Sequence, residues 1–347
     1  MNIRVGILTA PHIDFEQHEH TFLLKNVRIG IGFHWDRLED QEFAGKLEII
    51  KSQGQSQQPL YTAINTLDLE DYLCSVISSE MNANSPMELL KAHAVISRSW
   101  AIRAMQKPNH VGFDVCADDH CQRYEGLRRM NERAVQAVRE TAHQVLLFQS
   151  QGQSQICDCR YYKCCGGRTE IWRTCWEDID VPYIQSVECP YCGKAVHRTS
   201  LLRTFLNDYD QETKDFHDWE VTYTAEELSD IIREKSGIDF GTITDLIPLH
   251  RGASGRIDQL RIVGTKHTED IGKELKIRLW LSRKCLYSSW FEIHKSQMSN
   301  QFVLIGRGWG HGAGLCQIGA AEMAEEGFTY EQILAHYYRG AVLGNYQ

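Results

Sequence analysis

One acidic residue occupies a helical stripe that is otherwise apolar. Leu69, Leu73, Val76 and Ile77 recur at helical spacing, and the next position on the same stripe is Glu80. A stripe of this kind turns towards the interior, so it predicts a carboxyl group beside a desolvated surface. The carboxyl also lies near the C-terminal end of the helix, where the helix dipole disfavours negative charge. Both effects raise the pKa of a carboxyl group, which suits a general acid that works near neutral pH.

An ordinary structural role is the alternative for Glu80. The next helical segment carries two arginines, Arg98 and Arg103, and an ion pair with either would hold Glu80 ionised. Most glutamates lie on the surface or in such pairs. These residues alone therefore leave a catalytic acid and a paired carboxylate both open.

A short segment after the helices contains four side chains that bind metals. They are His110, Cys116, His120 and Cys121. Two thiolates and two imidazoles suit tetrahedral zinc, and four protein ligands predict a closed, structural site. The spacing is irregular, and the adjacent His120 and Cys121 point in opposite directions if the segment is a strand. Reduced core cysteines and surface histidines are the alternative.

Cysteine is abundant in this chain, with 12 residues in all. Because the sequence shows no secretory signal, metal binding or reduced structural thiols fit better than a disulfide framework. Cys189 and Cys192 form a C-x-x-C pair. Together with Cys157 and Cys159, this pair predicts a second zinc site or a redox pair.

The elements that must position these residues predict an α+β fold. Residues 1–66 alternate polar and apolar positions, as strands do, whereas residues 67–107 have the pattern of two helices. Asp68 can cap the first helix, and Ser85–Glu88 resembles a capping box before the second. The second helix is rich in Ala, Leu, Val and Ile. We therefore expect a mixed β-sheet core with a buried helical pair.

The character of the sequence changes between residues 197 and 268. A helix opens at Thr224 and a strand-like run follows at Gln259–Val263, so we expect a small α/β subdomain inserted there. Residues 1–196 and 269–347 would then form the two parts of one core. Within the second part, Thr329 begins the last helix with a capping box.

The composition excludes several classes of function. With 347 residues, 42% hydrophobic and 24% charged, the chain is typical of globular proteins. Its net charge of −9 argues against nucleic acids and anionic membranes as partners. No apolar run approaches the ~20 residues of a membrane helix, and the N-terminal apolar stretch is too short for a signal peptide. Either the chain works in the cytoplasm, or an export signal lies outside this sequence.

Three blocks of residues, taken in order, resemble the SpoIID/LytB family. The first block comprises Leu69–Leu73, Ser79-Glu80-Met81 and Leu90–Arg98; the second comprises Gly166–Glu170 and Pro182–Val187; the third comprises Gly308–Ala320 and Tyr337-Tyr338. Ser254-Gly255-Arg256 lies in register between the last two blocks. Any one block would be a weak signal, but three in order over roughly residue 60 to the C-terminus make chance resemblance improbable.

The resemblance implies a lytic transglycosylase that acts on peptidoglycan glycan strands. Such an enzyme cuts the β-1,4 bond between N-acetylmuramic acid (MurNAc) and N-acetylglucosamine (GlcNAc), and it leaves a 1,6-anhydro ring. The family's catalytic acid aligns with Glu80, and the chemistry needs no cofactor. Some family members bind zinc at the position of the His110 cluster. The role of the family implies that the protein works in the cell envelope.

A further set of residues are candidates for binding the substrate. They are Arg98, Tyr161, Tyr162, Gly166, Gly167, Arg168, Tyr183, Arg256, His311 and Gln317. Four glycines surround His311, which allows close backbone approach and positive φ, so we expect this loop to line a sugar cleft. The alternative is that this loop is a tight turn with only a structural role. For the tyrosines and arginines, the alternatives are core aromatics and solvated surface charges.

Two other functions remain open at this point. The amidase-enhancer branch of the family implies a non-catalytic protein that binds glycan and stimulates a partner amidase. The thiols and the missing export signal instead favour a cytoplasmic, metal-stabilised protein that works on recycled wall fragments.

Overall fold

The protein is an α+β protein, as the sequence predicts, and its elements fall into two compact units. The computed structural model describes residues 1–31, 36–52, 58–118, 120–150, 152–197, 204–206, 210, 216–296 and 300–346. The first unit comprises Met1–Cys159, Thr204–Gln211 and Ala341–Gln347; the second comprises Arg160–Arg203 and Glu212–Gly340. The division at residues 196 and 268 stays a prediction, and residues 198–203, 207–209 and 211–215 of that segment lie outside the described ranges.

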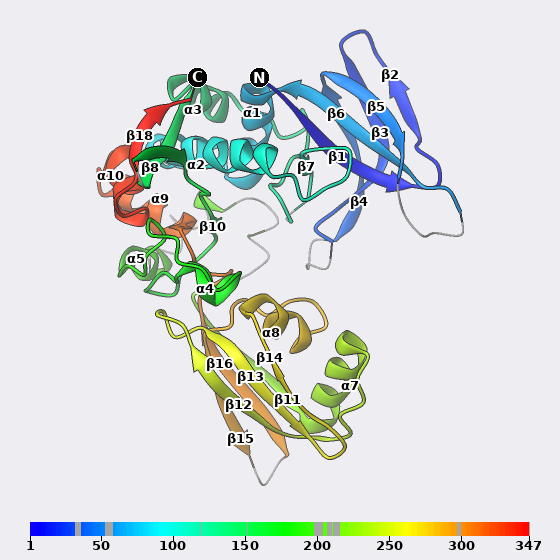
Figure 1. Ribbon diagram of the computed structural model, residues 1–347, viewed down its shortest axis with the longest axis vertical. Coiled ribbons are helices and arrows are strands. Elements are labelled where there is room, and N and C mark those ends of the chain that lie inside the picture. The colour runs from blue at the N-terminus through cyan, green and yellow to red at the C-terminus, as the bar shows by residue number, and fades with distance from the viewer. Residues whose placement is uncertain are drawn as a thin grey trace. The chain divides into compact units, whose positions relative to one another are not determined.

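The first unit begins with two sheets, whose strands β1 to β6 are drawn in blue in Figure 1. One has the order β5-β6-β1-β7, formed by Lys46–Lys51, Tyr61–Asp68, Asn2–Ala10 and Val115–Cys116. The other has the order β2-β3-β4, formed by Phe15–Gln17, Thr21–Ile29 and Arg37–Ala44. β7 runs parallel to β1, while β5, β6 and β1 pair antiparallel, so the first sheet is mixed.

Two buried helices follow β6 directly. α1 (Leu69–Glu80) begins after Asp68, whose side chain accepts a hydrogen bond from the backbone N–H of Glu70, and this confirms the predicted cap. α2 (Met87–Gln106) is buried along most of its length, which confirms the buried helical pair. The predicted capping box at Ser85 is wrong, because α2 starts one residue later and Pro86 occupies the cap position without a side-chain bond.

The first unit is completed by α3 and a three-stranded sheet. α3 spans Glu132–Glu140 and contacts both α1 and α2. The sheet has the order β18-β8-β9, formed by Val342–Asn345, Gln144–Ser150 and Gln153–Ile156. β8 also packs on α2.

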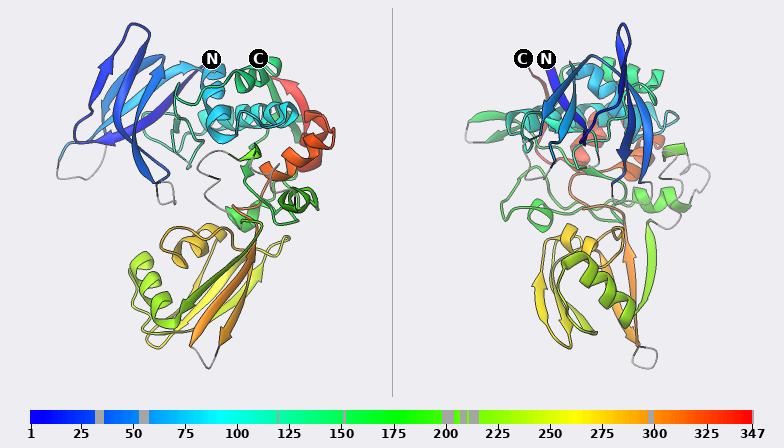
Figure 2. Two further views of the ribbon diagram at one scale, coloured as in Figure 1. Left: turned by 180° about the vertical axis from the view of Figure 1, so that it is seen from behind. Right: turned by 90° about the vertical axis from the view of Figure 1, so that its right-hand side faces the viewer.

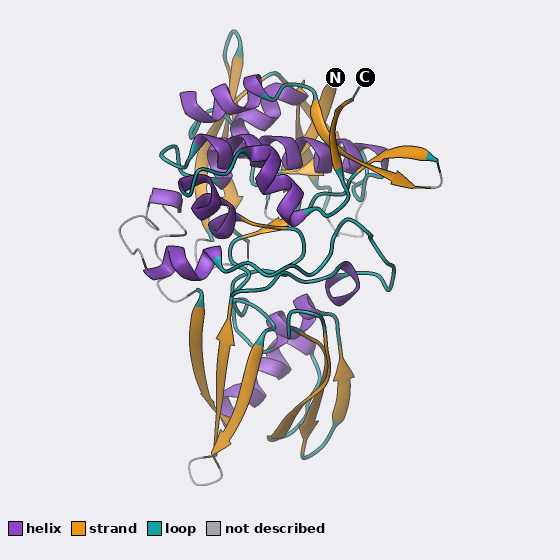
Figure 3. Ribbon diagram, turned by 90° about the vertical axis from the view of Figure 1, so that its left-hand side faces the viewer, coloured by secondary structure: helices purple, strands orange, loops and turns teal. Residues whose placement is uncertain are grey.

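The second unit contains two three-stranded antiparallel sheets around one apolar core. The orders are β11-β16-β15, formed by Asp218–Thr224, Gln301–Arg307 and Phe291–Ser296, and β12-β13-β14, formed by Ile243–Arg251, Ile257–Gly264 and Thr268–Ile271. α7 (Ala225–Ser236) contacts a strand of each sheet, and α8 (Glu274–Trp280) packs on β13 and α7. Figures 2 and 3 show these helices beside the two sheets.

The rest of the second unit consists of short elements joined by glycine-rich turns. They are β10 (Tyr161–Tyr162), α4 (Trp172–Cys175), α5 (Tyr191–His197), β17 (Leu315–Cys316), α9 (Gln317–Glu325) and α10 (Tyr330–Tyr337). β10 and β17 pair in parallel, and α9 begins directly after β17. The capping boxes at Thr224 and Thr329 are both present.

None of the described helices combines the length and the apolar character that a membrane span requires.

Candidate functional site

Glu80 is the last residue of α1, and 9% of the residue's surface is exposed. Its Oε1 accepts a hydrogen bond of 3.1 Å from the backbone N–H of Arg123. The carboxyl group therefore lies at the C-terminal end of a buried helix, as its place on the apolar stripe predicts. A hydrogen bond from the main chain fixes the position of one of its oxygens.

The segment that donates to Glu80 is itself tied to α1. The hydroxyl of Ser75 donates to the carbonyl of Gly126 over 2.6 Å, and the hydroxyl of Tyr72 donates to Oε1 of Gln122 over 3.1 Å. Residues 122–126 are all buried. Because both anchors come from the helix that carries Glu80, the Arg123 amide and the carboxyl keep a fixed relation.

The two arginines that could have paired with Glu80 make other contacts. Arg98 is fully buried and forms a bidentate pair with Glu70, with Nε–Oε1 and Nη2–Oε2 distances of 2.8 and 2.6 Å. Its guanidinium also donates to the carbonyls of Gln144 and Val138. Arg103 contacts Gln106. Arg98 thus joins α1 to the elements around it, and its substrate contact stays a prediction.

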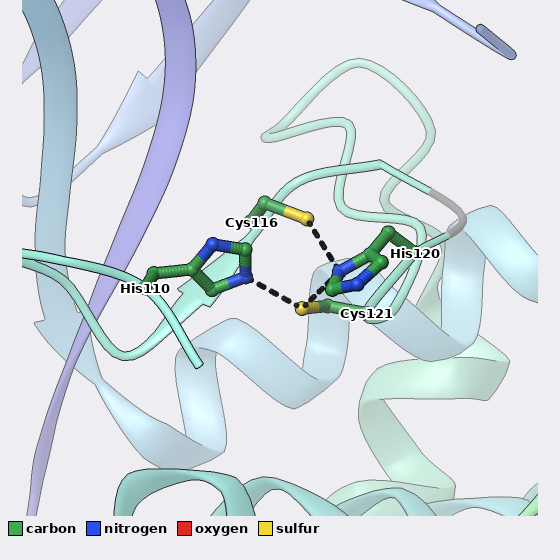
Figure 4. A group of neighbouring side chains, drawn as sticks. All are labelled: His110, Cys116, His120 and Cys121. Atoms are coloured by element: carbon green, nitrogen blue, oxygen red, sulfur yellow. Dashed lines mark hydrogen bonds between the residues drawn. The ribbon is translucent and has the colours of Figure 1, made fainter. Parts of the chain in front are cut away.

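The four predicted metal ligands of the first unit converge, as Figure 4 shows. The ligand atoms of His110, Cys116, His120 and Cys121 all lie within 4.8 Å of one another. Nε2 of His110 is 3.2 Å from Sγ of Cys121, and Nδ1 of His120 is 3.8 Å from Sγ of Cys116. This donor set of two sulfurs and two nitrogens fits tetrahedral zinc.

The neighbours His120 and Cys121 can share a site because they lie in a turn. The amide of Cys121 donates to the carbonyl of Asp118, so the alternation expected of a strand does not apply. Hydrogen bonds from Cys121 and His120 lower the pKa of the Cys116 thiol to about 4, despite its burial. The thiolate is the form that binds metals.

In the second unit, a buried carboxylate joins two of the family blocks. Glu170 accepts hydrogen bonds from the amides of Ala253 and Ser254 and, over 2.5 Å, from the Ser254 hydroxyl. The buried Arg256 donates to the Ser254 hydroxyl and to the carbonyl of Gly310, in the third block. Arg256 is therefore a bridge between backbone segments rather than a solvated surface charge.

His311 is held by the backbone at both ring nitrogens. Nε2 lies 3.0 Å from the Tyr161 carbonyl, and Nδ1 accepts from the amide of Ala313 at 3.1 Å. The rings of Tyr162 and Trp176 pack against it. Desolvation and the charges of nearby arginines hold the pKa of His311 well below its usual value, so the ring is neutral. This geometry gives His311 a role in fixing the loop, while its substrate contact stays a prediction.

The other predicted substrate-binding residues occupy different environments. Gly166, Gly167 and Arg168 line an open groove of about 700 Å³ within the second unit, together with Ser254, Gly255, Trp290 and Arg307. Arg168 lies 3.1 Å from Glu188 at the surface. Tyr162 and Gln317 are buried, whereas Tyr161 and Tyr183 are half-buried.

The cysteines that the sequence associates with Cys189 and Cys192 are not those that the structure brings to them. The sulfurs of Cys165 and Cys316 lie beside this pair, whereas Cys157 and Cys159 belong to the first unit. Nothing in the sequence indicates that Arg123 contacts Glu80 or that Glu170 is buried and holds Ser254. Glu170 lies inside the second family block, but the spacing of residues in the sequence does not indicate which residues it contacts.

Family models match two parts of the chain. A model described as stage II sporulation protein (SpoIID) covers residues 57–148, which include α1, α2 and the His110 cluster. A model described as a domain of unknown function (DUF8618) covers residues 170–314.

Several curated proteins are similar over most of the chain. An uncharacterized protein of Brachyspira hyodysenteriae is 31% identical over 285 residues, which are 82% of this chain and 68% of that protein. Stage II sporulation protein D of Bacillus subtilis is 26% identical over 307 residues, 81% of this chain and 77% of that protein. The amidase enhancer of Bacillus subtilis is 24% identical over 308 residues, 79% of this chain and 40% of that protein.

The family model and these relatives agree with the three blocks of sequence. The SpoIID family model covers the helices α1 and α2, the first of which ends at Glu80. The relatives extend the similarity to about four fifths of the chain. The chain therefore belongs to the SpoIID/LytB family.

Proposed function

We propose that this protein is a peptidoglycan lytic transglycosylase in which Glu80 is the single acid/base. Membership of the SpoIID/LytB family supports a role at the bacterial cell wall. The observation that carries the finer proposal is the place of Glu80, a residue that is 9% exposed at the end of a buried helix. The hydrogen bonds of Arg98 go to Glu70, and Arg103 contacts Gln106.

The first step breaks the bond between MurNAc and GlcNAc. The protonated carboxyl of Glu80 donates its proton to the bridging oxygen as the bond from that oxygen to C1 of MurNAc breaks. Positive charge develops on the MurNAc ring, and the GlcNAc unit leaves as an alcohol. Glu80 is now a carboxylate, and the N–H of Arg123 stabilises its negative charge, since hydrogen bonds to ions are the strong ones.

The second step closes the anhydro ring. The C6 hydroxyl of the same MurNAc attacks C1, and Glu80 accepts its proton, so the carboxyl returns to its starting state. Water takes no part in this sequence. One carboxyl therefore suffices, whereas a hydrolase usually needs a pair.

We also propose that His110, Cys116, His120 and Cys121 hold a structural zinc ion. When bound, the ion would cross-link the loop after α2 to the turn after β7, and it would supply no step of the cleavage. This turn leads within two residues to Arg123, whose amide contacts Glu80. A bound ion would therefore help to hold in place the backbone amide that donates to Glu80.

The groove in the second unit is the proposed surface for glycan. Trp290 offers an aromatic face, and Arg168 and Arg307 offer donors for sugar oxygens and for the MurNAc carboxylate. The glycines at 166 and 167, both with positive φ, let the ligand approach the main chain.

Digestion of purified sacculi, and of glycan strands stripped of stem peptides, tests the proposal. The wild-type protein should release 1,6-anhydro products that mass spectrometry detects. Glu80→Gln should release at least about 100-fold less, because general acid–base catalysis contributes 10²–10⁴-fold. The matched control is Glu132→Gln, the same change at an exposed acid in the first turn of α3. An undiminished yield from Glu80→Gln would falsify the assignment.

A second function is supported by one relative, which is named an amidase enhancer. On this account the protein binds glycan without cutting it and stimulates a partner amidase. Sedimentation with sacculi would then show binding with no soluble product, and added protein would raise the rate at which a purified amidase releases stem peptides. Anhydro products from the protein alone would exclude this as its sole function.

A further inference from the structure

The second unit contains a compact group of four buried cysteines. They are Cys165, Cys189, Cys192 and Cys316, each with a relative exposure of 0%. Their sulfurs all lie within 4.8 Å of one another. The cysteines come from three separate parts of the chain, namely the turn after β10, the start of α5 and the residue before α9. We propose that these four thiolates bind a structural zinc ion.

The spacing of the sulfurs fits one tetrahedral ion. A zinc–sulfur bond of about 2.3 Å places the sulfurs of a tetrahedral site about 3.8 Å apart. The sulfurs of Cys165 and Cys192 are 3.3 Å apart, which is well beyond the ~2.05 Å of a disulfide bond. An iron–sulfur cluster would need to fit its inorganic core between the same sulfurs, so a single ion is the better match.

Backbone amides point at the sulfurs, as they do around bound thiolates. The amides of Cys165 and Gly319 donate to Sγ of Cys316 over 3.2 and 3.3 Å, and the amide of Gly167 donates to Sγ of Cys165 over 3.3 Å. The hydroxyl of Tyr337 lies 3.2 Å from Sγ of Cys189. Such donors stabilise negative charge on a ligating sulfur and orient it.

The side chains of Tyr337 and of two cysteines in the group leave no room at Gly319 for anything larger than its hydrogen. A methyl group at Gly319 would lie 2.6 Å from Sγ of Cys189 and 2.4 Å from the Tyr337 hydroxyl. Cys164 and His217 form a group with Cys192 that is separate from the group of four sulfurs. We therefore place Cys164 and His217 beside the four ligands rather than among them.

The proposed ion has a structural consequence. It would fasten the Gly166–Gly167 turn, which lines the groove, to the start of α9 and to α5. This inference concerns metal binding and holds whether or not the protein cleaves glycan.

Zinc and iron analysis of purified, reduced full-length protein tests the inference. With the His110 cluster also occupied, the wild type should contain about two zinc ions per chain. Cys189→Ser/Cys192→Ser should lose about one ion, Cys116→Ser/Cys121→Ser should lose the other, and Cys285→Ser, at a free cysteine outside both clusters, should lose none. Unchanged zinc in Cys189→Ser/Cys192→Ser would overturn the proposal.

Two further measurements apply to folded protein with all four cysteines in place. X-ray absorption of Cys116→Ser/Cys121→Ser should show zinc surrounded by four sulfurs at about 2.3 Å. Gly319→Ala should release zinc to a chelator faster than wild type, whereas Gly193→Ala, where the nearest atom to the new methyl is 3.5 Å away, should not. Iron with inorganic sulfide, nitrogen ligands in the absorption spectrum, or a Cys165–Cys192 disulfide in native protein would contradict a four-sulfur zinc site.

Discussion

Two buried glutamates near the end of α1 show how burial alone fails to identify a catalytic residue. Glu125 is 1% exposed, and its carboxylate lies 2.5 Å from Nε of Arg129. Burial raises the pKa of Glu125, and the charges of Arg129 and Arg123 act in the opposite direction. Glu80 accepts a hydrogen bond from the backbone N–H of Arg123. Burial is common to both residues, and it is the place of Glu80 in the first family block that marks it as the proposed acid.

We predict that Glu80→Gln lowers activity but not stability, and that Glu125→Gln lowers stability. Glu80→Gln keeps an oxygen that can accept from Arg123, so unfolding free energy should change by less than about 1 kcal/mol while kcat falls about 10²–10⁴-fold. Glu125→Gln removes the buried charge that pairs with Arg129 and should cost about 3 kcal/mol of stability. Urea unfolding and anhydro-product release measure the two quantities. A Glu80→Gln protein that loses stability but keeps its rate would reverse the assignment.

His311 should make stability depend on pH. Its folded pKa lies well below the ordinary value of 6.5, so below that value the unfolded chain binds a proton that the folded chain does not. Stability should therefore fall as pH drops from 6.5 towards the folded pKa, by up to about 1.4 kcal/mol per pH unit. In urea unfolding between about pH 7.5 and pH 5, His311→Gln should show a shallower slope than wild type. Equal slopes would show that His311 is not the group responsible.

At the scale of elements, local signals in the sequence were sufficient to place the helices near the candidate site. Asp68 as a cap and the apolar stripe predict a helix that ends near Glu80, and α1 spans Leu69–Glu80. The capping boxes at Thr224 and Thr329 are equally local and are also present. At Ser85 the same rule fails, because Pro86 takes the cap position and the pattern does not specify which residue starts the helix.

The segment that reaches Glu80 depends on one glycine. Gly126 has φ +63, and a methyl group there would lie 2.2 Å from the carbonyl oxygen of Glu42. Gly126→Ala should lose stability through both its φ and this contact, by about 2–5 kcal/mol in total, and should lower activity by shifting Arg123. The matched control is Gly152→Ala, with φ +79 and no atom within 4 Å, which should cost only about 1–2 kcal/mol. Equal losses in the two variants, measured by urea unfolding, would count against the steric argument.

At the scale of the whole molecule, the sequence could not predict which distant residues meet. The His110 cluster falls within 12 residues, so its types and spacing were enough to propose it. Cys165, Cys192 and Cys316 come from distant segments, and no periodic pattern in the sequence indicates a contact between residues so far apart in the chain. The same limit hides the network from Glu170 through Ser254 to Arg256, which joins the second and third family blocks.

Because each cysteine cluster lies within one unit, loss of zinc should have a local effect. Cys116→Ser/Cys121→Ser should weaken amide protection in the first unit, above all in residues 110–126, and leave α9 and α10 protected. Cys189→Ser/Cys192→Ser should do the reverse. Hydrogen exchange followed by mass spectrometry checks both variants. Uniform loss of protection in either variant would mean that the ions stabilise the chain as a single cooperative whole.

The central claim is that Glu80 alone handles the proton while the sugar's own C6 hydroxyl displaces the leaving group. Digestion of peptide-free glycan strands in ¹⁸O-labelled water tests it most directly. The account predicts unlabelled 1,6-anhydro ends from the wild type and at least about 100-fold fewer from Glu80→Gln. Reducing ends that carry ¹⁸O, or anhydro ends that form equally fast without the Glu80 carboxyl, would contradict it.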